Sequence, residues 1–340
     1  MVTLQEIADR AGVSVSTASR VLSGVKSTVP ISETTRQKVR QLAEELGYYP
    51  NVAARALSSR RAGAIGLVIP AGIAERGYQR FYGLKLHEVL AGVELVANEA
   101  DLNLIVQVAN DHFFAERGLM RMINGRLVDT LILYEVTLPS EEICEGYPVI
   151  FLNTFNGDED KNYIIADDYG GTQRAVDYLV GLGHRRIGFI AGPDDHFVSR
   201  ERRRGYEASM MEHGLAPTIF EGDLSEESGI RGARSLISRG PGVTTIFAGG
   251  DYMAVGVLEV AREMGISVPG KLSIMGADGM QVGAYTTPAI TTIVTALYSM
   301  SRMAAGWAVK LFDKEETGLV QEVFPTEIEE RESCGPAPES

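Results

Sequence analysis

The chain has 340 residues, of which 45% are apolar and 23% charged, and it carries a net charge of −13, a composition typical of a soluble globular protein with two or three compact units. No apolar run approaches the ~20 residues needed to cross a bilayer, and residues 1–10 carry charges without an apolar stretch, so we expect neither a membrane span nor a signal peptide. The two cysteines, Cys144 and Cys334, lie far apart, which indicates no disulfide framework and fits a reducing cytoplasm.

The charge is divided unevenly along the chain. Residues 1–61 contain nine Lys and Arg against five Asp and Glu, whereas the remainder contains 23 against 40. A small basic head can contact phosphates, and an acidic body is repelled by DNA, which limits nonspecific binding. This asymmetry predicts a nucleic-acid-binding head on a large acidic body.

Three short helices are predicted in the first 47 residues. Thr3 and Glu6 form a capping box at the start of the first helix. Gly12 ends that helix, and Ser14 can cap a second helix from Val15 to Leu22. A third helix with a 3.6-residue apolar period follows, and this order describes a helix-turn-helix unit. A generic small helical bundle is the alternative, but the hydroxyl-rich outer face of the second helix argues against it.

From residue 64 onward the sequence alternates between strands and helices. Short continuous apolar runs separated by amphipathic segments are typical of parallel sheets covered on both faces. The expected strands span residues 65–69, 104–108, 131–133, 149–152, 187–190, 245–248, 273–275 and 290–294. The expected helices include residues 85–99, 172–182, 201–213, 229–238 and 252–264. Two doubly wound α/β halves fit this pattern, followed by a disordered tail over residues 332–340, which are rich in Pro, Gly and Ser.

Several motifs resemble the lactose-repressor (LacI) family of transcriptional regulators. In the head these are VTLQEIA (2–8), AGVSVSTASRVL (11–22) and ELGYYPN (45–51). In the body they are LGHRRI (182–187), AGP (191–193), GY (205–206), TTP (286–288), TTI (291–293) and PTE (325–327). The resemblance covers nearly the whole chain in the family's order. It implies a regulator that acts as a repressor on a near-palindromic operator, under the control of a small sugar-like effector.

The resemblance also implies a domain plan. Residues 1–49 form the helix-turn-helix domain, and residues 50–63 a hinge helix and linker that is too short to be stable alone. Residues 64–331 form an effector-binding and dimerisation unit with the fold of periplasmic sugar-binding proteins. One lobe comprises 64–165 plus 294–322 and the other 166–293 plus 323–331. A homodimer or a dimer of dimers is implied, and the lack of C-terminal leucine heptads favours the dimer.

The resemblance assigns DNA contacts to the second helix. Val15, Ser16 and Arg20 occupy the family's base-contacting positions. Arginine can donate two hydrogen bonds to guanine, serine can pair with most base edges, and valine can meet a thymine methyl group. A surface salt bridge is the alternative role for Arg20. Four hydroxyl side chains complete the predicted DNA-binding face of the head: Thr3, Ser14, Thr17 and Ser19. Thr17 and Ser19 are expected to contact phosphates.

The hinge supplies the remaining predicted DNA contacts. Leu57 matches the family's hinge leucine, which wedges into the minor groove and kinks the duplex. Asn51 is a plausible helix cap, and Ala54 allows close approach to DNA on the same segment. Packing on the body is the alternative role for Leu57. The hinge is expected to be disordered without DNA and helical on it, so the effector could act through its order.

Ligands of open α/β sheets bind at the carboxyl ends of strands, where this sequence places small or polar residues. By resemblance, Asn153, Arg202, Asp251 and Asp278 lie in or beside the cleft. Ala71, at a strand end, and Tyr82, in the long loop after that strand, are two further candidates for effector binding. Arg202 and Asp278 form the pair best suited to vicinal hydroxyls, because a planar fork and a carboxylate can each bind two oxygens. A structural ion pair is the alternative for Arg202, and a helix cap is the alternative for Asp251.

The sequence departs from the family's pattern at three places, which leaves the effector's identity open. Gly250-Asp251 stands where many members have Asn-Asp, and Asn153 stands where many have Asp. The loop from Pro70 to about Leu86 is longer than usual and brings four large side chains: Tyr78, Arg80, Phe81 and Tyr82. Aromatic residues stack on sugar rings, but this loop could instead form a dimer contact.

Other function classes find less support. The sequence has no Walker A motif, GxGxxG motif, nucleophile elbow or zinc-binding helix, and its five histidines are scattered, so we expect no enzyme, metal or cofactor. A periplasmic sugar-binding protein would have a signal peptide and lack the basic head. A sugar-metabolising enzyme with a fused regulatory head would need a catalytic constellation that is not found. Whether the effector releases DNA or tightens its binding stays open, as do the operator sequence and the regulated genes.

Overall fold

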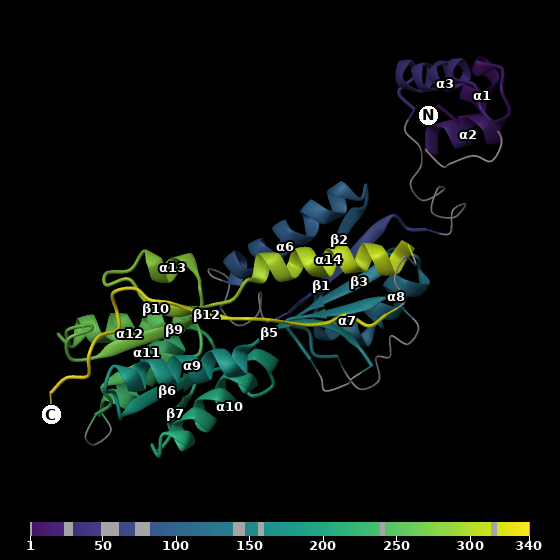
Figure 1. Ribbon diagram of the computed structural model, residues 1–340. Helices are drawn as coiled ribbons and strands as arrows, with labels where there is room; N and C mark the ends of the chain where they lie inside the picture. Colours follow the sequence, from purple (N-terminus) through teal and green to yellow (C-terminus); the bar gives the residue numbers. More distant parts are fainter. Residues whose placement is uncertain are drawn as a thin grey trace.

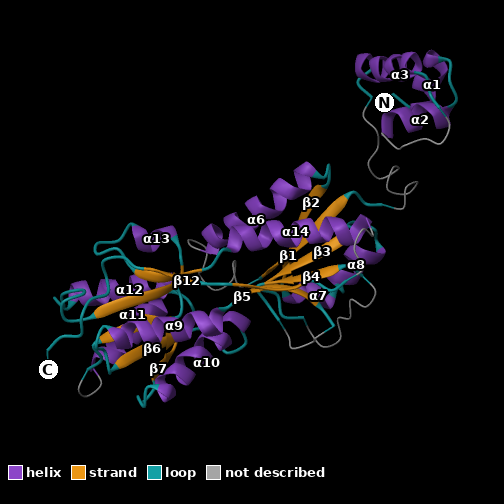
Figure 2. Ribbon diagram, in the orientation of Figure 1, coloured by secondary structure: helices purple, strands orange, loops and turns teal. Residues whose placement is uncertain are grey.

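The computed structural model describes residues 2–23, 30–48, 61–71, 82–138, 147–155, 160–238, 242–313 and 318–339. A helical head precedes two α/β lobes, each built on one six-stranded sheet (Figure 1). Helices cover both faces of each sheet (Figure 2). This arrangement confirms the predicted fold class. No helix in these ranges has both the length and the apolar character needed to cross a membrane.

The head contains α1 (Leu4–Ala11), α2 (Val15–Ser23) and α3 (Glu33–Glu45). Their small apolar core is Ile7, Ala8, Ala11, Ala18, Val21, Val39 and Ala43. Half of the predicted capping box is present, because the Thr3 hydroxyl accepts a hydrogen bond from the Glu6 N–H at 3.3 Å. The Glu6 carboxylate instead pairs with Arg10 at 2.8 Å. An i,i+4 ion pair on the exposed face thus replaces the reciprocal half of the box.

Lobe one has the strand order β11-β5-β4-β3-β1-β2. The strands are β1 (Ala64–Pro70), β2 (Asn103–Ala109), β3 (Thr130–Tyr134), β4 (Val149–Leu152), β5 (Asn162–Ala166) and β11 (Gln321–Phe324). All pair in parallel, with Ile65 opposite both Leu104 and Thr130. The helices are α6 (Tyr82–Glu99), α7 (Asp111–Ala115), α8 (Gly118–Asn124) and α14 (Leu297–Asp313).

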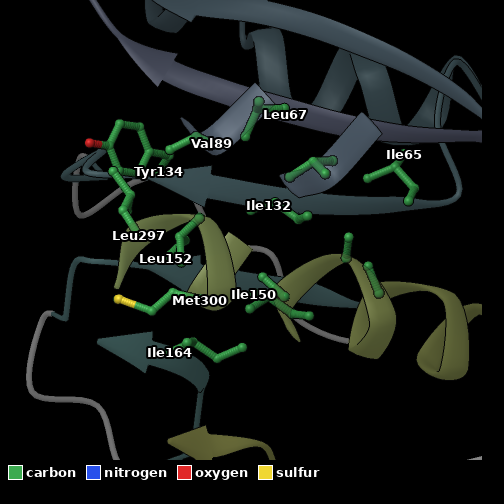
Figure 3. Packing of buried hydrophobic residues seen from close by; sticks show 14 of the residues in the cluster. Ile65, Leu67, Val89, Ile132, Tyr134, Ile150, Leu152, Ile164, Leu297 and Met300 are labelled. Carbon is green, nitrogen blue, oxygen red and sulfur yellow. The ribbon is translucent and has the colours of Figure 1, made fainter. Parts of the chain in front are cut away.

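The two faces of the lobe-one sheet have separate cores. Figure 3 shows Ile65, Ile132 and Ile150 of neighbouring strands packed with Val89 of α6 and Met300 of α14. On the opposite face, buried side chains of α7 and α8 meet the alternate strand residues, including Val68 and Leu131. Fully buried parallel strands carry apolar residues on both faces, which is why they read as continuous apolar runs in the sequence.

Lobe two has the strand order β12-β10-β9-β8-β6-β7. The strands are β6 (Ile187–Ala191), β7 (Thr218–Glu221), β8 (Thr245–Ala248), β9 (Ser273–Asp278), β10 (Thr291–Val294) and β12 (Glu327–Glu329), and only β12 is antiparallel to its neighbour. The helices are α9 (Asp168–Gly181), α10 (Phe197–Glu212), α11 (Glu226–Ser238), α12 (Asp251–Glu263) and α13 (Gln281–Ala284). Buried residues of α9 and α10 pack on one face, and those of α11 and α12 on the other.

The chain passes between the lobes after β5, after β10 and after β11. The last passage differs from the predicted boundary between residues 322 and 323. Val323 and Phe324 pair with Ile165 and Ala166 in the lobe-one sheet, so the chain leaves lobe one after Phe324. Val294, expected in lobe one, pairs with Asp278 in lobe two. Strand pairing, rather than the motif positions, sets these limits.

The predicted disordered tail is wrong over residues 332–339, which lie along lobe two (Figure 1). Ser333 is fully buried, and its hydroxyl accepts a hydrogen bond from the Thr291 N–H at 2.9 Å. The Ser333 carbonyl accepts another from the Ile274 N–H at 2.9 Å. Further along, the Ala337 N–H donates to the Leu182 carbonyl at 2.8 Å. Pro, Gly and Ser predict irregular backbone, but irregular backbone is ordered wherever its polar groups find fixed partners.

Candidate effector cleft and DNA-recognition helix

The outer face of α2 presents the predicted base-contacting side chains to solvent. Val15, Ser16 and Arg20 are exposed, and 36% of the Val15 residue is accessible although it is apolar. Thr17 and Ser19 are half-buried at the margin of this face. Gly12, at φ 73°, closes α1 in the left-handed conformation that lets the chain turn directly into α2. The structure thus brings the side chains of the predicted recognition helix onto one accessible face.

Two of the predicted DNA-binding residues also cap helices. The Thr3 hydroxyl caps α1, and the Ser14 hydroxyl accepts a hydrogen bond from the Thr17 N–H at 3.1 Å at the start of α2. Ser14 also lies within hydrogen-bond distance of the Ser16 and Thr17 hydroxyls, at 2.9 and 2.8 Å. The predicted hinge contacts Asn51, Ala54 and Leu57 lie outside the described residues.

In the body, polar side chains from both lobes meet where strands end and helices begin. Lobe one contributes Glu135 directly after β3, Asn153 directly after β4 and Lys85 near the start of α6. Lobe two contributes Arg202 from α10 and Asp278 from the end of β9. Asp168 and Asp251 begin α9 and α12. We call this set of seven residues the interlobe cluster.

Arg202 is the centre of the lobe-two half. Its Nε donates to Asp168 Oδ1 at 2.7 Å, its Nη1 to the Gly249 carbonyl at 2.9 Å, and its Nη2 lies 2.9 Å from Asp278 Oδ1. The residue is only 2% exposed. Burial alone disfavours the charged form of Arg202, but Asp168 and Asp278 outweigh burial and raise its pKa. Arg202 and Asp278 are therefore in direct contact, which is the structural ion pair left open as the alternative for Arg202, and their binding of effector hydroxyls stays a prediction.

Asp278 also connects the two lobes. Its Oδ1 lies 3.0 Å from Lys85 Nζ, which in turn lies 3.7 Å from Glu135 Oε1. Glu135 Oε1 accepts a hydrogen bond from Asn153 Nδ2 at 2.8 Å, and its Oε2 lies 3.5 Å from His196 Nε2 of lobe two. Two polar contacts, Lys85 with Asp278 and His196 with Glu135, thus cross between the lobes.

The charges in the cluster shift the pKa values of its members. Burial would raise the pKa of Asp278, but Lys85 and Arg202 lower it below its ordinary value. Burial would likewise lower the pKa of Lys85, yet Asp278 and Glu135 raise it. Burial raises the pKa of Asp168 despite the nearby Arg202. Asp278 and Lys85 are therefore held as an ion pair at neutral pH.

Asp251 is held by hydrogen bonds within lobe two. Its two carboxylate oxygens accept hydrogen bonds from the Thr292 hydroxyl and the Met280 N–H, both at 2.6 Å. It is fully buried, and Gly250, not Asp251, is the N-cap residue of α12. Burial and the nearby Asp278 raise its pKa to about 7. Asp251 thus ties α12 to β10 and to the segment after β9, instead of capping its helix.

Three members of the cluster have positive φ angles. They are Glu135 at 49°, Asn153 at 53° and Asp278 at 124°. Residues other than glycine rarely adopt this region, and such strain gathers at functional sites. All three follow or end a strand, and the unusual backbone turns their side chains into the cluster. The strain is consistent with a site built for binding.

Of the two remaining predicted effector residues, only Ala71 has a described side chain. Ala71 is half-buried at the end of β1. Tyr82 begins α6, but its side chain is not among the described ones. Among the described residues, no hydrogen bond or ion pair joins Ala71 to the interlobe cluster.

Sequence reasoning missed Lys85, Glu135, Asp168 and His196. Glu135 and Asp168 had a usable signal, since Glu135 directly follows an apolar strand and Asp168 lies at a helix start. Lys85 and His196 had none, because each looks like an ordinary polar residue of a helix or loop. Within the described ranges, no group of three or more His, Cys, Asp or Glu residues is arranged to hold a metal ion.

Comparisons with known proteins agree with the architecture. Residues 3–51 match bacterial regulatory proteins of the lacI family, and residues 176–334 match a periplasmic binding protein-like domain. Catabolite control protein A of Priestia megaterium is 30% identical over 342 residues, which covers 98% of this chain and 99% of that protein.

Solved structures extend the likeness to the whole fold. A structure described as a transcriptional regulator CelR-cellobiose complex is 28% identical with a TM-score of 0.73, covering 98% of this chain and 100% of the other. The lac repressor dimer bound to operator and the anti-inducer ONPF has a TM-score of 0.85 at 24% identity, covering 98% and 99% of the two chains, and shows the fold. The chain is 30% identical to Catabolite control protein A over nearly its full length, and residues 3–51 match the lacI family. The chain therefore belongs to the lacI family of bacterial transcriptional regulators.

Proposed function

We propose that this regulator binds a near-palindromic operator as a homodimer and that a small sugar-like effector in the cleft between the lobes controls its affinity for DNA. The cleft would bind the effector through Arg202, Asp278 and Asn153, with Ala71 and Tyr82 at its margin and Asp251 supporting Asp278 from behind. One observation carries the proposal: the interlobe cluster joins the carboxyl ends of strands in both lobes, which is where ligands of such sheets bind.

The DNA-binding half of the proposal rests on α2. Its exposed face combines one arginine, which can read guanine, with hydroxyls that can reach phosphates or base edges. The DNA backbone would be contacted by Thr3, Ser14, Thr17 and Ser19. The bases between these contacts would be read by Val15, Ser16 and Arg20. In the hinge, Asn51, Ala54 and Leu57 would complete the contacts in the minor groove. Dimeric binding would place two such helices on two half-sites.

Two comparisons support the sugar-like effector and the dimer. The CelR structure at 28% identity is described as a cellobiose complex, and the lac repressor structure as a dimer on its operator. We further propose that the protein acts in the cytoplasm at the nucleoid and has no catalytic activity. The full-length relatives carry names of control proteins and transcriptional regulators.

The test starts from the full-length protein and a random DNA pool. Operator selection should enrich a palindromic motif, and binding to that motif should change in the presence of one member of a panel of sugars and sugar derivatives. The direction of the change would separate an inducer from a corepressor. If no motif is enriched while a sugar still binds the body, the head is not a working DNA reader and the regulator proposal fails.

A further inference from the structure

The ammonium group of Lys85 lies between carboxylates of the two lobes. Its Nζ is 3.0 Å from Asp278 Oδ1 of lobe two and 3.7 Å from Glu135 Oε1 of lobe one. Only 12% of the Lys85 side chain is exposed, and the Glu135 side chain is completely buried. One nearly buried cation is therefore shared by two carboxylates of different lobes and reduces the repulsion between them.

The cluster contains more carboxylates than cations. Against Glu135, Asp168, Asp251 and Asp278 stand Lys85 and Arg202, with His196 beside Glu135. All three guanidinium nitrogens of Arg202 are engaged by protein oxygens. A negatively charged ligand in the place of the Lys85 ammonium would face Glu135 and Asp278 and be repelled by both, whereas a group that donates hydrogen bonds would be accepted by them.

The unsatisfied atoms of the cluster are hydrogen-bond acceptors. Asn153 Oδ1 and Asp168 Oδ2 are buried without a hydrogen-bond partner among the described residues, and the two residues are 1% and 2% exposed. Asn153 donates through Nδ2 to Glu135 Oε1, the carboxylate oxygen that also faces Lys85. Buried acceptors require donors, and a ligand rich in N–H or O–H groups can supply them.

We propose that the space between Glu135 and Asp278 is a binding subsite for a hydrogen-bond-donating group of the effector, which the ammonium of Lys85 occupies until the effector displaces it. The effector is then a compound with many hydroxyls or an amine and without a negative charge, rather than a sugar phosphate or sugar acid. The statement that the bound group belongs to an effector rests on the proposed function. The existence of the subsite rests only on the contacts of Lys85, Glu135 and Asp278.

The first test removes the ammonium group of Lys85 by mutation and supplies a free alkylammonium ion in solution. In the full-length protein, Lys85→Ala should lower the midpoint of thermal unfolding by about 5 °C or more, and ethylammonium chloride should restore at least half of the loss. Sodium chloride at the same ionic strength and sodium acetate should not. Lys271→Ala removes an exposed lysine of lobe two and should change neither the midpoint nor the response. The proposed subsite would be refuted if sodium chloride restored the unfolding midpoint as well as ethylammonium chloride does, or if ethylammonium chloride did not restore it.

A second variant covers the possibility that Lys85→Ala does not fold. Glu135→Gln added to Lys85→Ala removes one of the two carboxylates, so the double variant should have a higher midpoint than the single variant. If Lys85 served only to fill space, the second substitution would lower the midpoint further or leave it unchanged. That result would also overturn the proposal.

The ligand class is tested with matched compounds on the wild-type protein. For each sugar of the panel, the uncharged form, the amino form and the phosphorylated form are compared by calorimetry. The uncharged or amino form should bind at least tenfold more tightly, and a phosphorylated compound as the tightest ligand would refute the inference. An intact ammonium response with no operator motif would instead refute the proposed regulator function and leave the subsite standing.

Discussion

Lys85 and Asp278 belong to different lobes, yet the ammonium nitrogen of one lies 3.0 Å from a carboxylate oxygen of the other. Arg202 Nη2 lies 2.9 Å from the same oxygen. One carboxylate oxygen therefore joins α6 of lobe one to α10 of lobe two. A ligand that binds at Asp278 must rearrange a contact between the lobes, which gives a physical route from the cleft to the relative position of the lobes.

We expect Asp278→Asn to destabilise the protein by about 3–5 kcal/mol, because removal of one partner leaves two nearly buried cations short of a counter-charge. Urea unfolding of the variant and the wild type measures the difference. Asp194→Asn is the matched control, since the Asp194 side chain is 74% exposed in its pair with Arg203 and should cost less than about 1 kcal/mol. Equal losses in the two variants would show that the interlobe position has no special role.

The pKa of Asp251 predicts a pH dependence. Burial and Asp278 raise this pKa to about 7, so the folded state keeps a proton that the unfolded state has released above its ordinary pKa of 3.8. The contribution of Asp251 to stability therefore falls as the pH rises from about 4 to 7 and is level above that. Comparing wild type with Asp251→Asn by urea unfolding at several pH values isolates this group. A difference between the two proteins that stays constant over this range would contradict it.

Arg20→Ala should weaken binding to the selected operator by about 10- to 100-fold, as expected for loss of a bidentate contact with a base. It should also reduce the ratio between the affinity for the operator and the affinity for scrambled DNA. Fluorescence anisotropy with both duplexes measures the two affinities. Arg10→Ala is the control, because it removes a positive charge that already pairs with Glu6 on α1. An equal loss on both duplexes would mean that Arg20 contacts only phosphates.

Ser333→Ala should destabilise the protein by about 2–4 kcal/mol. The Ser333 hydroxyl accepts from the Thr291 N–H and donates to the Ile274 carbonyl, and each buried group left without a partner costs about 1–3 kcal/mol. Thermal or urea unfolding measures the loss. Glu339→Gln lies on the exposed end of the same segment and should have no effect. A wild-type stability of Ser333→Ala would mean that the C-terminal segment contributes nothing to lobe two.

The strands predicted from sequence are those with continuous apolar runs. They are β1, β2, β3, β4, β6, β8, β9 and β10, and all but the edge strand β2 lie in the interior of the two sheets. β5, β7, β11 and β12 were not predicted, because mixed or charged residues such as Asn162, Glu221, Gln321 and Glu327 break their apolar pattern. Their pairing is fixed by neighbouring strands far away in sequence, which local patterning does not record.

The same distinction applies to the cleft. Arg202 and Asp278 were predicted to bind hydroxyls of the effector together, and the structure places the two side chains in contact with each other. Lys85 was not predicted, because none of the family motifs includes it and its contacts with Glu135 and Asp278 form only in the folded chain. Asp251 was placed near the cleft by its position after a strand, but its hydrogen bonds point to Thr292 and Met280. Sequence position shows which strand end a residue occupies, whereas the direction of its side chain depends on contacts between elements.

The measurement that tests the central claim most directly compares effector responses of wild type and Arg202→Lys on the selected operator. Lysine keeps the positive charge but cannot reproduce the three contacts of the guanidinium fork. We predict that the active compound changes the operator affinity of the wild type at least tenfold, and that Arg202→Lys binds the operator but responds at least tenfold less sensitively to the compound. An Arg202→Lys protein that responds to the same concentration of compound as the wild type would contradict control of DNA binding through the interlobe cleft.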